Sequence, residues 1–300
     1  MTFEQIRLDV VDGIATITLD RPEKLNAFSD IMEGELMRAL GRVDDDDEVR
    51  ALVLTGSGHA FCAGMDLGGN DASAIDWGSG DPSDSEGGSR PSDELRRDGG
   101  GRVVLRMFEM RKPVIAAING PAVGVGLTMT LAADFRLAVP AAKLGLVFAR
   151  RGLVPESCSS WFLPRLVGMQ TALEWVYSGR LFSSEDALTA GLVRSLHDPA
   201  ELLDDAHGLA VSLTESSAPV SLALSRQMLW RLSAAPHPVV AHEVETLALN
   251  ARLSSRDAEE GIAAFLEKRP AAFIDKVSRD SPEVFGTFEA PEYRPVKKGK

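Results

Sequence analysis

The sequence has little of what disulfide-rich, metal-binding or membrane-spanning proteins require. Only two of its 300 residues are cysteines, Cys62 and Cys158, so neither a disulfide framework nor a zinc site of four cysteines can be built. The five histidines are scattered without the spacing of metal ligands, and no metal is expected. No apolar run approaches the roughly 20 residues that a membrane-spanning helix needs.

Basic residues are fewer than acidic ones, so the formal net charge is -12. This balance argues against a general polyanion binder, and no nucleic-acid partner is expected. The first ten residues lack the basic and apolar regions of a signal peptide, so we expect a cytoplasmic protein without a membrane partner. A composition of 44% hydrophobic and 25% charged residues is ordinary for a globular protein with a sizeable core.

The stretch 112–137 organises the chain. An apolar run at 114–118 predicts a strand, Asn119-Gly120-Pro121 predicts a turn, and the apolar segment after Gly124 and Gly126 has the length of a helix. The free backbone N–H groups of such a helix start can bind a phosphate or stabilise an oxyanion. A dinucleotide site would need a third glycine, where this chain has Thr128 and Met129.

Other segments carry clear local signals. Residues 3–11 and 14–19 predict a hairpin, and Ser29 predicts the N-cap of a helix that reaches Val43. A strand at 51–55 precedes a second glycine turn, so two successive turns of one ββα spiral are indicated. Helical periodicity dominates the last third, over residues 171–177, 184–190, 200–215, 220–232, 238–253 and 257–268.

Residues 68–101 are rich in Gly, Ser, Asp and Pro and have few apolar side chains. Such a segment is not expected to pack as a core element. Two interpretations stay open: a disordered surface loop, or a mobile lid that orders over substrate. The domain organisation predicted is therefore a core over 1–200 that contains this loop, a helical region over 201–278 and a tail over 279–300.

Four motifs in register carry a family resemblance. RPEKLNAFS (21–29), HAFCAGMDL (59–67), INGPAVGVGL (118–127) and GLVPE (152–156) resemble the enoyl-CoA hydratase/isomerase (crotonase) superfamily over about residues 3–275. The resemblance implies an α/β spiral of ββα turns with a C-terminal helical trimerisation region, and assembly as a homotrimer or dimer of trimers. It also implies an acyl-CoA thioester substrate, with no cofactor beyond the coenzyme A that the substrate carries.

The oxyanion hole of that family consists of two backbone N–H groups, which correspond here to Met65 and Val125. An enolate forming at a thioester carbonyl needs two preorganised donors, and glycine-rich backbone allows close approach. The alternative is that both segments are only tight packing turns.

Hydratases of the family use two glutamates for proton transfer, and Thr128 and Phe148 stand at those positions in this sequence. Glu156 instead matches the glutamate of Δ3,Δ2-enoyl-CoA isomerases. One carboxylate can remove a proton at C2 and return it at C4, whereas hydration usually divides its proton transfers between two groups. We expect burial among Val154, Trp161 and Phe162 to raise the pKa of Glu156.

Rival interpretations remain for both the residue and the protein. Glu156 is alternatively a first-turn carboxylate of a helix over 157–167. For the protein, the single carboxylate favours an isomerase that moves the double bond of a 3-enoyl-CoA to the 2-position. The first alternative is hydration of 2-enoyl-CoA, and the second is a non-catalytic acyl-CoA-binding or scaffold protein.

The resemblance also implies which residues hold coenzyme A. Two loops form the walls of the nucleotide pocket, and basic and aromatic residues near the C-terminus approach it from the same or a neighbouring subunit. The residues concerned are Lys24, Leu25, Ala27, Ala63, Gly64, Asp66, Gly124, Lys268 and Phe273. For Asp66, a structural hydrogen bond to nearby loop amides is favoured over proton transfer.

Overall fold

The structure is a computed structural model of the chain, and it describes residues 2–67, 97–286 and 293–296. A six-stranded sheet forms its centre, in the order β1-β2-β3-β4-β6-β9, beside a three-stranded sheet in the order β5-β7-β8. The strands are β1 Ile6–Val11, β2 Ile14–Leu19, β3 Ala51–Gly56, β4 Val114–Ile118, β5 Ala122–Val123, β6 Phe135–Ala138, β7 Lys143–Gly145, β8 Leu181–Ser183 and β9 Ser195–Leu196.

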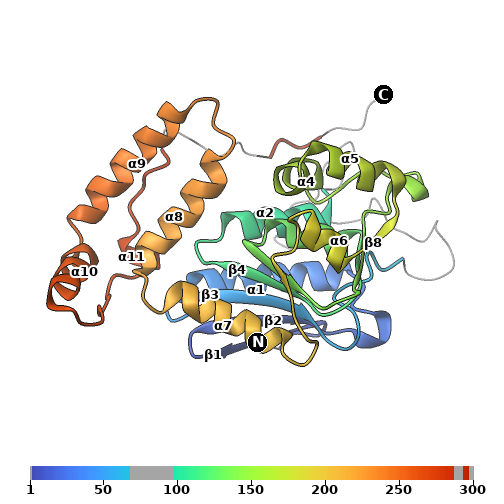
Figure 1. The fold of residues 1–300 in the computed structure, drawn as a ribbon, viewed down its shortest axis with the longest axis horizontal. Helices are drawn as coiled ribbons and strands as arrows, with labels where there is room; N and C mark the ends of the chain where they lie inside the picture. Colours follow the sequence, from blue (N-terminus) through green and yellow to red (C-terminus); the bar gives the residue numbers. More distant parts are fainter. Residues whose placement is uncertain (1, 68–96, 287–292, 297–300) are drawn as a thin grey trace, which may run out of the picture.

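Helices surround the sheets (Figure 1). They are α1 Asp30–Asp45, α2 Gly99–Glu109, α3 Val125–Thr128, α4 Ser159–Val167, α5 Met169–Ser178, α6 Ser184–Thr189, α7 Leu202–Thr214, α8 Pro219–Leu232, α9 Pro238–Leu253, α10 Arg256–Glu267 and α11 Val277–Asp280. Short 3-10 turns are η1 Pro22–Lys24, η4 Met129–Ala132 and η5 Ala149–Arg151. No helix in these ranges is long and apolar enough to cross a membrane.

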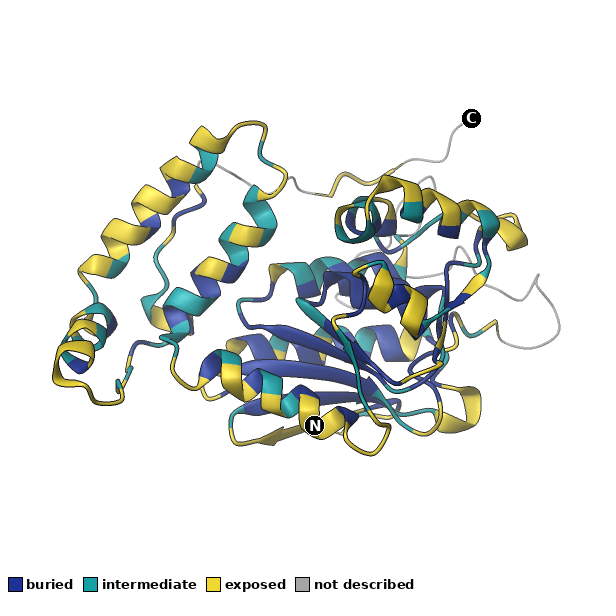
Figure 2. Cartoon of the chain, in the orientation of Figure 1, coloured by how far each residue is buried: buried dark blue, intermediate teal, exposed yellow. Residues whose placement is uncertain are grey.

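The local sequence signals produce the expected elements at the N-terminus. β1 and β2 pair antiparallel with Val11 opposite Ile14, across the predicted turn. The Ser29 hydroxyl accepts a hydrogen bond from the Met32 amide and so caps α1, as predicted. β2, β3, β4, β6 and β9 run parallel, and every residue of β2 and β4 is buried. These strands form the centre of the core (Figure 2).

The helix predicted after Gly124 is shorter than its apolar segment suggested. α3 has only four residues and continues as the 3-10 turn η4, after which Ala133 leaves the helical conformation. All eight residues of α3 and η4 are buried. Apolar length therefore reflects burial on all sides here, and not a long amphipathic helix.

Helices α8, α9 and α10 form an arm that projects from the core (Figure 1). The arm has a small core of its own, in which Val220 and Leu224 of α8 pack with Val244 and Ala248 of α9. α7 packs instead against β2, β3, β4 and β6. The division of the chain at residue 200 stays a prediction, and this packing places α7 with the sheet.

A buried arginine fixes the arm to the core. The Arg226 guanidinium of α8 forms an ion pair with Asp134 at 2.8 Å and donates to the Met107 and Met110 carbonyls at the end of α2. Asp134 also accepts from the Trp230 indole at 2.6 Å. If α8 left the core, Asp134 would lose its ion-pair partner, and the Met107 and Met110 carbonyls would lose their donor.

Candidate active site

Two glycine-rich turns meet beyond the carboxyl ends of the parallel strands β3 and β4. Cys62 bridges to Ala122, and the Val123 amide donates to the Cys62 carbonyl at 3.1 Å. A Cβ atom at Gly126 would lie 2.1 Å from that carbonyl oxygen, so only glycine allows the two turns to approach this closely. The two segments predicted to supply an oxyanion hole therefore lie side by side.

The amides of Met65 and Val125 donate to no acceptor in the described part of the chain. Val125 is the first residue of α3, where the N–H group has no partner within the helix. Gly64 and Gly124, which precede them, have φ angles of +115° and +57°. Glycine conformations thus set the orientation of both peptide groups.

Glu156 lies close to the start of this short helix. The Thr128 hydroxyl of α3 donates to Glu156 Oε1 at 2.5 Å, and the Ser157 hydroxyl donates to Oε2. The helix that follows begins only at Ser159, with Cys158 at its N-cap and no side-chain cap. Glu156 therefore does not cap a helix, and its carboxyl group faces the Thr128 side of the site.

The surroundings raise the pKa of Glu156 from 4.5 to about 7. Burial is the largest cause, since it disfavours the charged form, and the negative charge of Asp98 adds to it. Hydrogen bonds from Ser157 and Thr128 act in the opposite direction. The predicted direction is confirmed, but Val154 is 77% exposed and does not contribute the burial that the sequence suggested.

Asp98 is the functional neighbour that the sequence did not reveal. It was included in the segment 68–101 that was expected not to pack, yet Asp98 caps α2, and Gly100 and Gly101 are buried. The part of that segment over 68–96 lies outside the described residues. A cap signal followed by an apolar helix was present at Asp98, but the preceding polar composition obscured it.

Gly100 of α2 lies against Glu156. A Cβ atom there would lie 2.1 Å from Ser157 Oγ, 2.7 Å from Glu156 Oε2 and 2.8 Å from a Val125 methyl carbon. The first turn of α2 therefore reaches both the proposed acid/base group and the start of α3. No larger residue fits without displacing one of them.

Comparisons with known proteins now bear on this geometry. The sequence model of the enoyl-CoA hydratase/isomerase family matches residues 9–276. The chain belongs to this family. As a member, it is an enzyme that acts on acyl-CoA thioesters.

Named relatives in the family are mostly hydratases. Enoyl-CoA hydratase ACTT3 of Alternaria alternata is 37% identical over 273 residues, which cover 91% of this chain and 86% of the relative. The 1,2-epoxyphenylacetyl-CoA isomerase of Escherichia coli is 34% identical over 91% of this chain and 99% of the relative. The solved structure of a probable enoyl-CoA hydratase/isomerase from Mycobacterium abscessus has a TM-score of 0.77 and 31% identity, over 90% of this chain and 99% of that one. The crotonase fold that the motifs implied is confirmed.

Thr128 and Phe148 stand where hydratases of the family have their two glutamates, and both side chains border the site. Thr128 is fully buried and donates to Glu156, and Phe148 lies with its ring 4.0 Å from the Cβ position of Gly124. Neither side chain carries a carboxylate. Glu156 is thus the described acid that accepts a hydrogen bond from Thr128, the last residue of α3.

The two loops that the family resemblance assigns to coenzyme A are joined. The Ala63 amide donates to the Leu25 carbonyl at 3.0 Å, and the Phe28 amide donates to the Gly64 carbonyl at 2.8 Å. Lys24, Leu25 and Ala63 are exposed, Ala27 is partly exposed, and Gly64 and Gly124 are buried backbone. The loops form one wall, and its role in binding coenzyme A stays a prediction.

Asp66 forms an ion pair with Arg21 at 2.8 Å, while the Arg21 guanidinium also donates to the Ala27 carbonyl. This carboxylate therefore joins the two loops through the Arg21 guanidinium, and its place in the coenzyme A wall stays a prediction. The side chain of Asn26 also links the first loop to the turn after β3, because it donates to the Ser57 and Ala60 carbonyls at 2.8 Å.

Lys268 and Phe273 are not brought to the site within one chain. Lys268 is the exposed C-cap of α10, and Phe273 packs near Gly261 of the same helix. α10 forms the far end of the arm from α2 and α4 (Figure 1). Their predicted contact with coenzyme A would require a neighbouring subunit.

The two thiols are not activated. Burial raises the pKa of Cys62 to about 11, and burial also raises the pKa of the half-buried Cys158. Within the described ranges, no three His, Cys, Asp or Glu side chains gather where a metal ion could bind.

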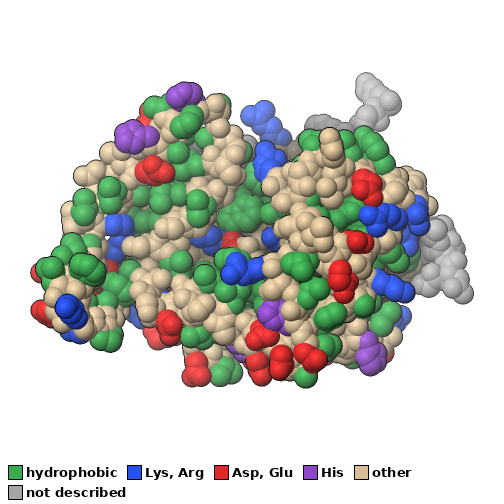
Figure 3. Space-filling view, viewed as in Figure 1, with side chains coloured by type: hydrophobic (Ala, Val, Ile, Leu, Met, Phe, Trp, Pro, Cys, Tyr) green, Lys and Arg blue, Asp and Glu red, His purple; other side chains and the backbone are tan. Residues whose placement is uncertain are grey.

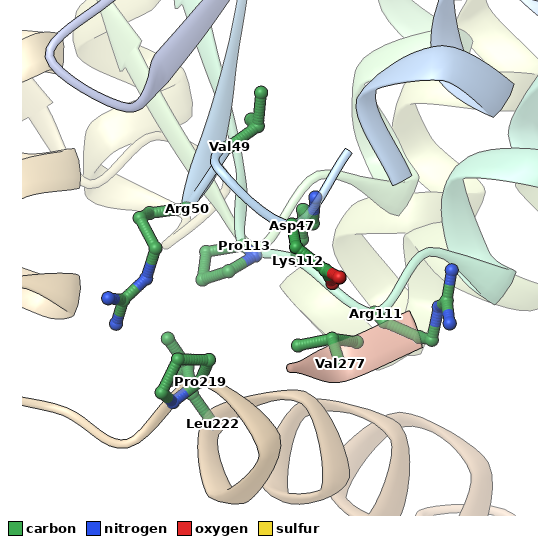
Figure 4. Close-up of a pocket in the computed structure, with 9 residues that line it drawn as sticks. All are labelled: Asp47, Val49, Arg50, Arg111, Lys112, Pro113, Pro219, Leu222 and Val277. Carbon is green, nitrogen blue, oxygen red and sulfur yellow. The ribbon is translucent and has the colours of Figure 1, made fainter. Parts of the chain in front are cut away.

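One pocket opens elsewhere, between the amino ends of β3 and β4 and the helix α8 (Figure 4). It contains none of the predicted site residues, and its lining is Asp47, Val49, Arg50, Arg111, Lys112, Pro113, Pro219, Leu222 and Val277. Burial lowers the pKa of Lys112 to about 8, and its ammonium group donates to the Val43 and Asp46 carbonyls at the end of α1. These contacts assign Lys112 to the capping of α1.

Proposed function

We propose that this enzyme moves the double bond of a 3-enoyl-CoA to the 2-position, with Glu156 as the single acid/base group. The observation that carries the proposal is the Glu156 carboxyl group, whose pKa burial raises to about 7, beside the short helix α3. The amides of Val125, at the start of that helix, and of Met65 donate to no acceptor within the described ranges. Such a pKa allows one group to accept and return a proton near neutral pH.

The reaction needs two proton transfers and one stabilised intermediate. Ionised Glu156 removes a proton from C2, and the electron pair moves into the thioester carbonyl to give a dienolate. The amides of Met65 and Val125 donate to the enolate oxygen. Protonated Glu156 then returns the proton to C4 as the carbonyl re-forms, which leaves the double bond between C2 and C3.

Hydration of 2-enoyl-CoA is the second candidate, and the names of the relatives favour it over isomerisation. The argument against it is the number of free carboxylates. Asp98 accepts three hydrogen bonds from backbone amides, which favour a structural role for this carboxylate over the activation of water. Glu156 would have to perform both proton transfers of hydration.

Product analysis distinguishes the two candidates. Purified enzyme is offered 3-enoyl-CoA and 2-enoyl-CoA separately, and the products are separated by mass and chromatography. The proposal predicts 2-enoyl-CoA from the first substrate and a loss of that activity by at least about 100-fold in Glu156→Gln. Dominant, Glu156-dependent formation of 3-hydroxyacyl-CoA would establish hydration instead, and binding without turnover of either would indicate an acyl-CoA-binding protein.

We also propose that the arm mediates assembly into trimers or dimers of trimers. Large apolar side chains of its outer helices are exposed: Leu247, Leu249 and Leu253 of α9, and Ile262, Phe265 and Leu266 of α10. Figure 3 shows hydrophobic side chains on the surface of the arm. Phe265 is 81% exposed in the single chain. Light scattering should give the mass of three or six chains, and Phe265→Asp should reduce it; a monomeric wild-type protein would contradict the proposal.

A further inference from the structure

Asp98 connects the first turn of α2 to the turn that carries Glu156. Its Oδ1 accepts from the Gly100 amide at 3.0 Å, and its Oδ2 accepts from the Gly101 amide at 3.0 Å. The same Oδ2 accepts from the Ser157 amide at 2.6 Å. One carboxylate therefore ties together two segments that are 59 residues apart in sequence.

The turn that Asp98 holds has an unfavourable backbone. Ser157 and Cys158 both have φ angles of +53°, in the left-handed region that residues other than glycine rarely adopt. Ser157 is fully buried, and its hydroxyl donates to Glu156 Oε2. A backbone of this kind persists only when surrounding contacts fix it, and the Asp98 contact with the Ser157 amide is one of them.

Asp98 also presents a negative charge to Glu156. The other titratable groups that face Glu156 in the described ranges are the thiols of Cys62, from the glycine turn after β3, and Cys158, from its own segment. α3 contributes only the neutral hydroxyl of Thr128, and Arg97 acts on Cys158. After burial, the charge of Asp98 is the next largest cause of the raised pKa of Glu156.

We propose that Asp98 is a positioning residue that aims the Glu156 carboxyl group at the substrate and places a negative charge beside it. The proposal rests on the proposed acid/base role of Glu156. Asp98 acts through Glu156 and Ser157 and does not itself touch the substrate. Its charge makes ionised Glu156 a stronger base for removal of the C2 proton, while the Ser157 contact keeps the carboxyl group in place.

The test is the pH dependence of kcat/KM in Asp98→Asn. Asparagine remains a good N-cap for α2 but removes the negative charge. The acidic limb of the profile, where Glu156 must ionise, should move to lower pH by roughly one unit. Thr128→Val removes a hydrogen bond to the ionised carboxylate, and its acidic limb should move to higher pH. An Asp98→Asn enzyme that turns over with the wild-type acidic limb would overturn the proposal.

A second variant and a second readout protect the test from a folding defect. Asp98→Ser also keeps a capping side chain and should shift the limb in the same direction, in protein whose circular dichroism matches the wild type. The second readout is the free energy of unfolding as a function of pH, which can be measured without turnover. The part of its pH dependence that comes from Glu156 should weaken when Asp98 is replaced. Stability profiles unchanged by either replacement would count against the charge of Asp98.

Failure of this proposal is distinguishable from failure of the proposed function. If Glu156 is not the acid/base group, Glu156→Gln retains turnover and the wild-type profile has no Glu156-dependent limb. If Glu156 is catalytic and Asp98 is not its positioning residue, Glu156→Gln is inactive while Asp98→Asn leaves the limb in place.

Discussion

Replacing Glu156 with glutamine should make the folded protein more stable above neutral pH while it removes activity. Folding raises the pKa of this carboxyl group from 4.5 to about 7. The native state therefore holds the proton more tightly than the unfolded chain, and stability falls as pH rises between these two values. The glutamine side chain of the variant would mimic the protonated form and escape this loss, because an amide cannot ionise.

The size of the effect follows from the change in pKa. A rise of the Glu156 pKa from 4.5 to about 7 corresponds to roughly 3 kcal/mol at full ionisation. The free energy of unfolding of Glu156→Gln, relative to the wild type, should therefore rise by up to about 3 kcal/mol between pH 4.5 and pH 8. In a chain of this length, the change amounts to a few degrees in Tm.

The assay is thermal or urea unfolding of both proteins across this pH range at one protein concentration. Glu259→Gln is a suitable control, because Glu259 is exposed on α10 and should change stability by no more than about 0.5 kcal/mol at any pH. A stability difference between Glu156→Gln and wild type that is the same at pH 5 and pH 8 would refute the raised pKa.

Three further substitutions test the packing of the site, one of its amide donors and the anchoring of the arm. Gly100→Ala should reduce kcat by at least about tenfold, because its Cβ would lie 2.1 Å from Ser157 Oγ. The control Gly208→Ala in α7, whose Cβ would have no atom within 4 Å, should leave kcat unchanged. Equal kcat values for the two variants would contradict the close packing at Gly100. Val125→Pro removes one amide donor at a helix position that accepts proline, and steady-state kinetics should show about 100-fold lower kcat than Val125→Ala. Similar kcat values for these two variants would exclude that donor. Arg226→Ala leaves Asp134 without its ion-pair partner and should lower the free energy of unfolding by roughly 3 kcal/mol or more in urea, and a loss below about 1 kcal/mol would contradict the anchoring role.

Local signals in the sequence were sufficient for much of the fold. The turn at Asp12-Gly13 and the cap at Ser29 act within a few residues, so hairpin and helix follow from the order of the residues. The length of α3 did not follow in this way. The apolar run covers both α3 and the 3-10 turn η4, all of whose residues are buried, so it does not show that the α-helix ends at Thr128.

The residues of the candidate site also differ in how far the sequence alone could predict them. Met65, Val125 and Glu156 were found because motifs of the family contain them. Asp98 acts on Ser157 across 59 residues and through space, and its own surroundings are rich in Gly, Ser and Asp. Only the folded chain brings that carboxylate to Glu156.

The most direct test of a single acid/base carboxylate follows one hydrogen atom. A 3-enoyl-CoA deuterated at C2 is converted by the wild-type enzyme in ordinary water, and the position of deuterium in the 2-enoyl-CoA product is determined by NMR and mass spectrometry. Glu156 acting alone predicts that a measurable fraction of product carries the C2 deuterium at C4. A product whose new C4 hydrogen comes entirely from water, or a 3-hydroxyacyl product, would contradict this account.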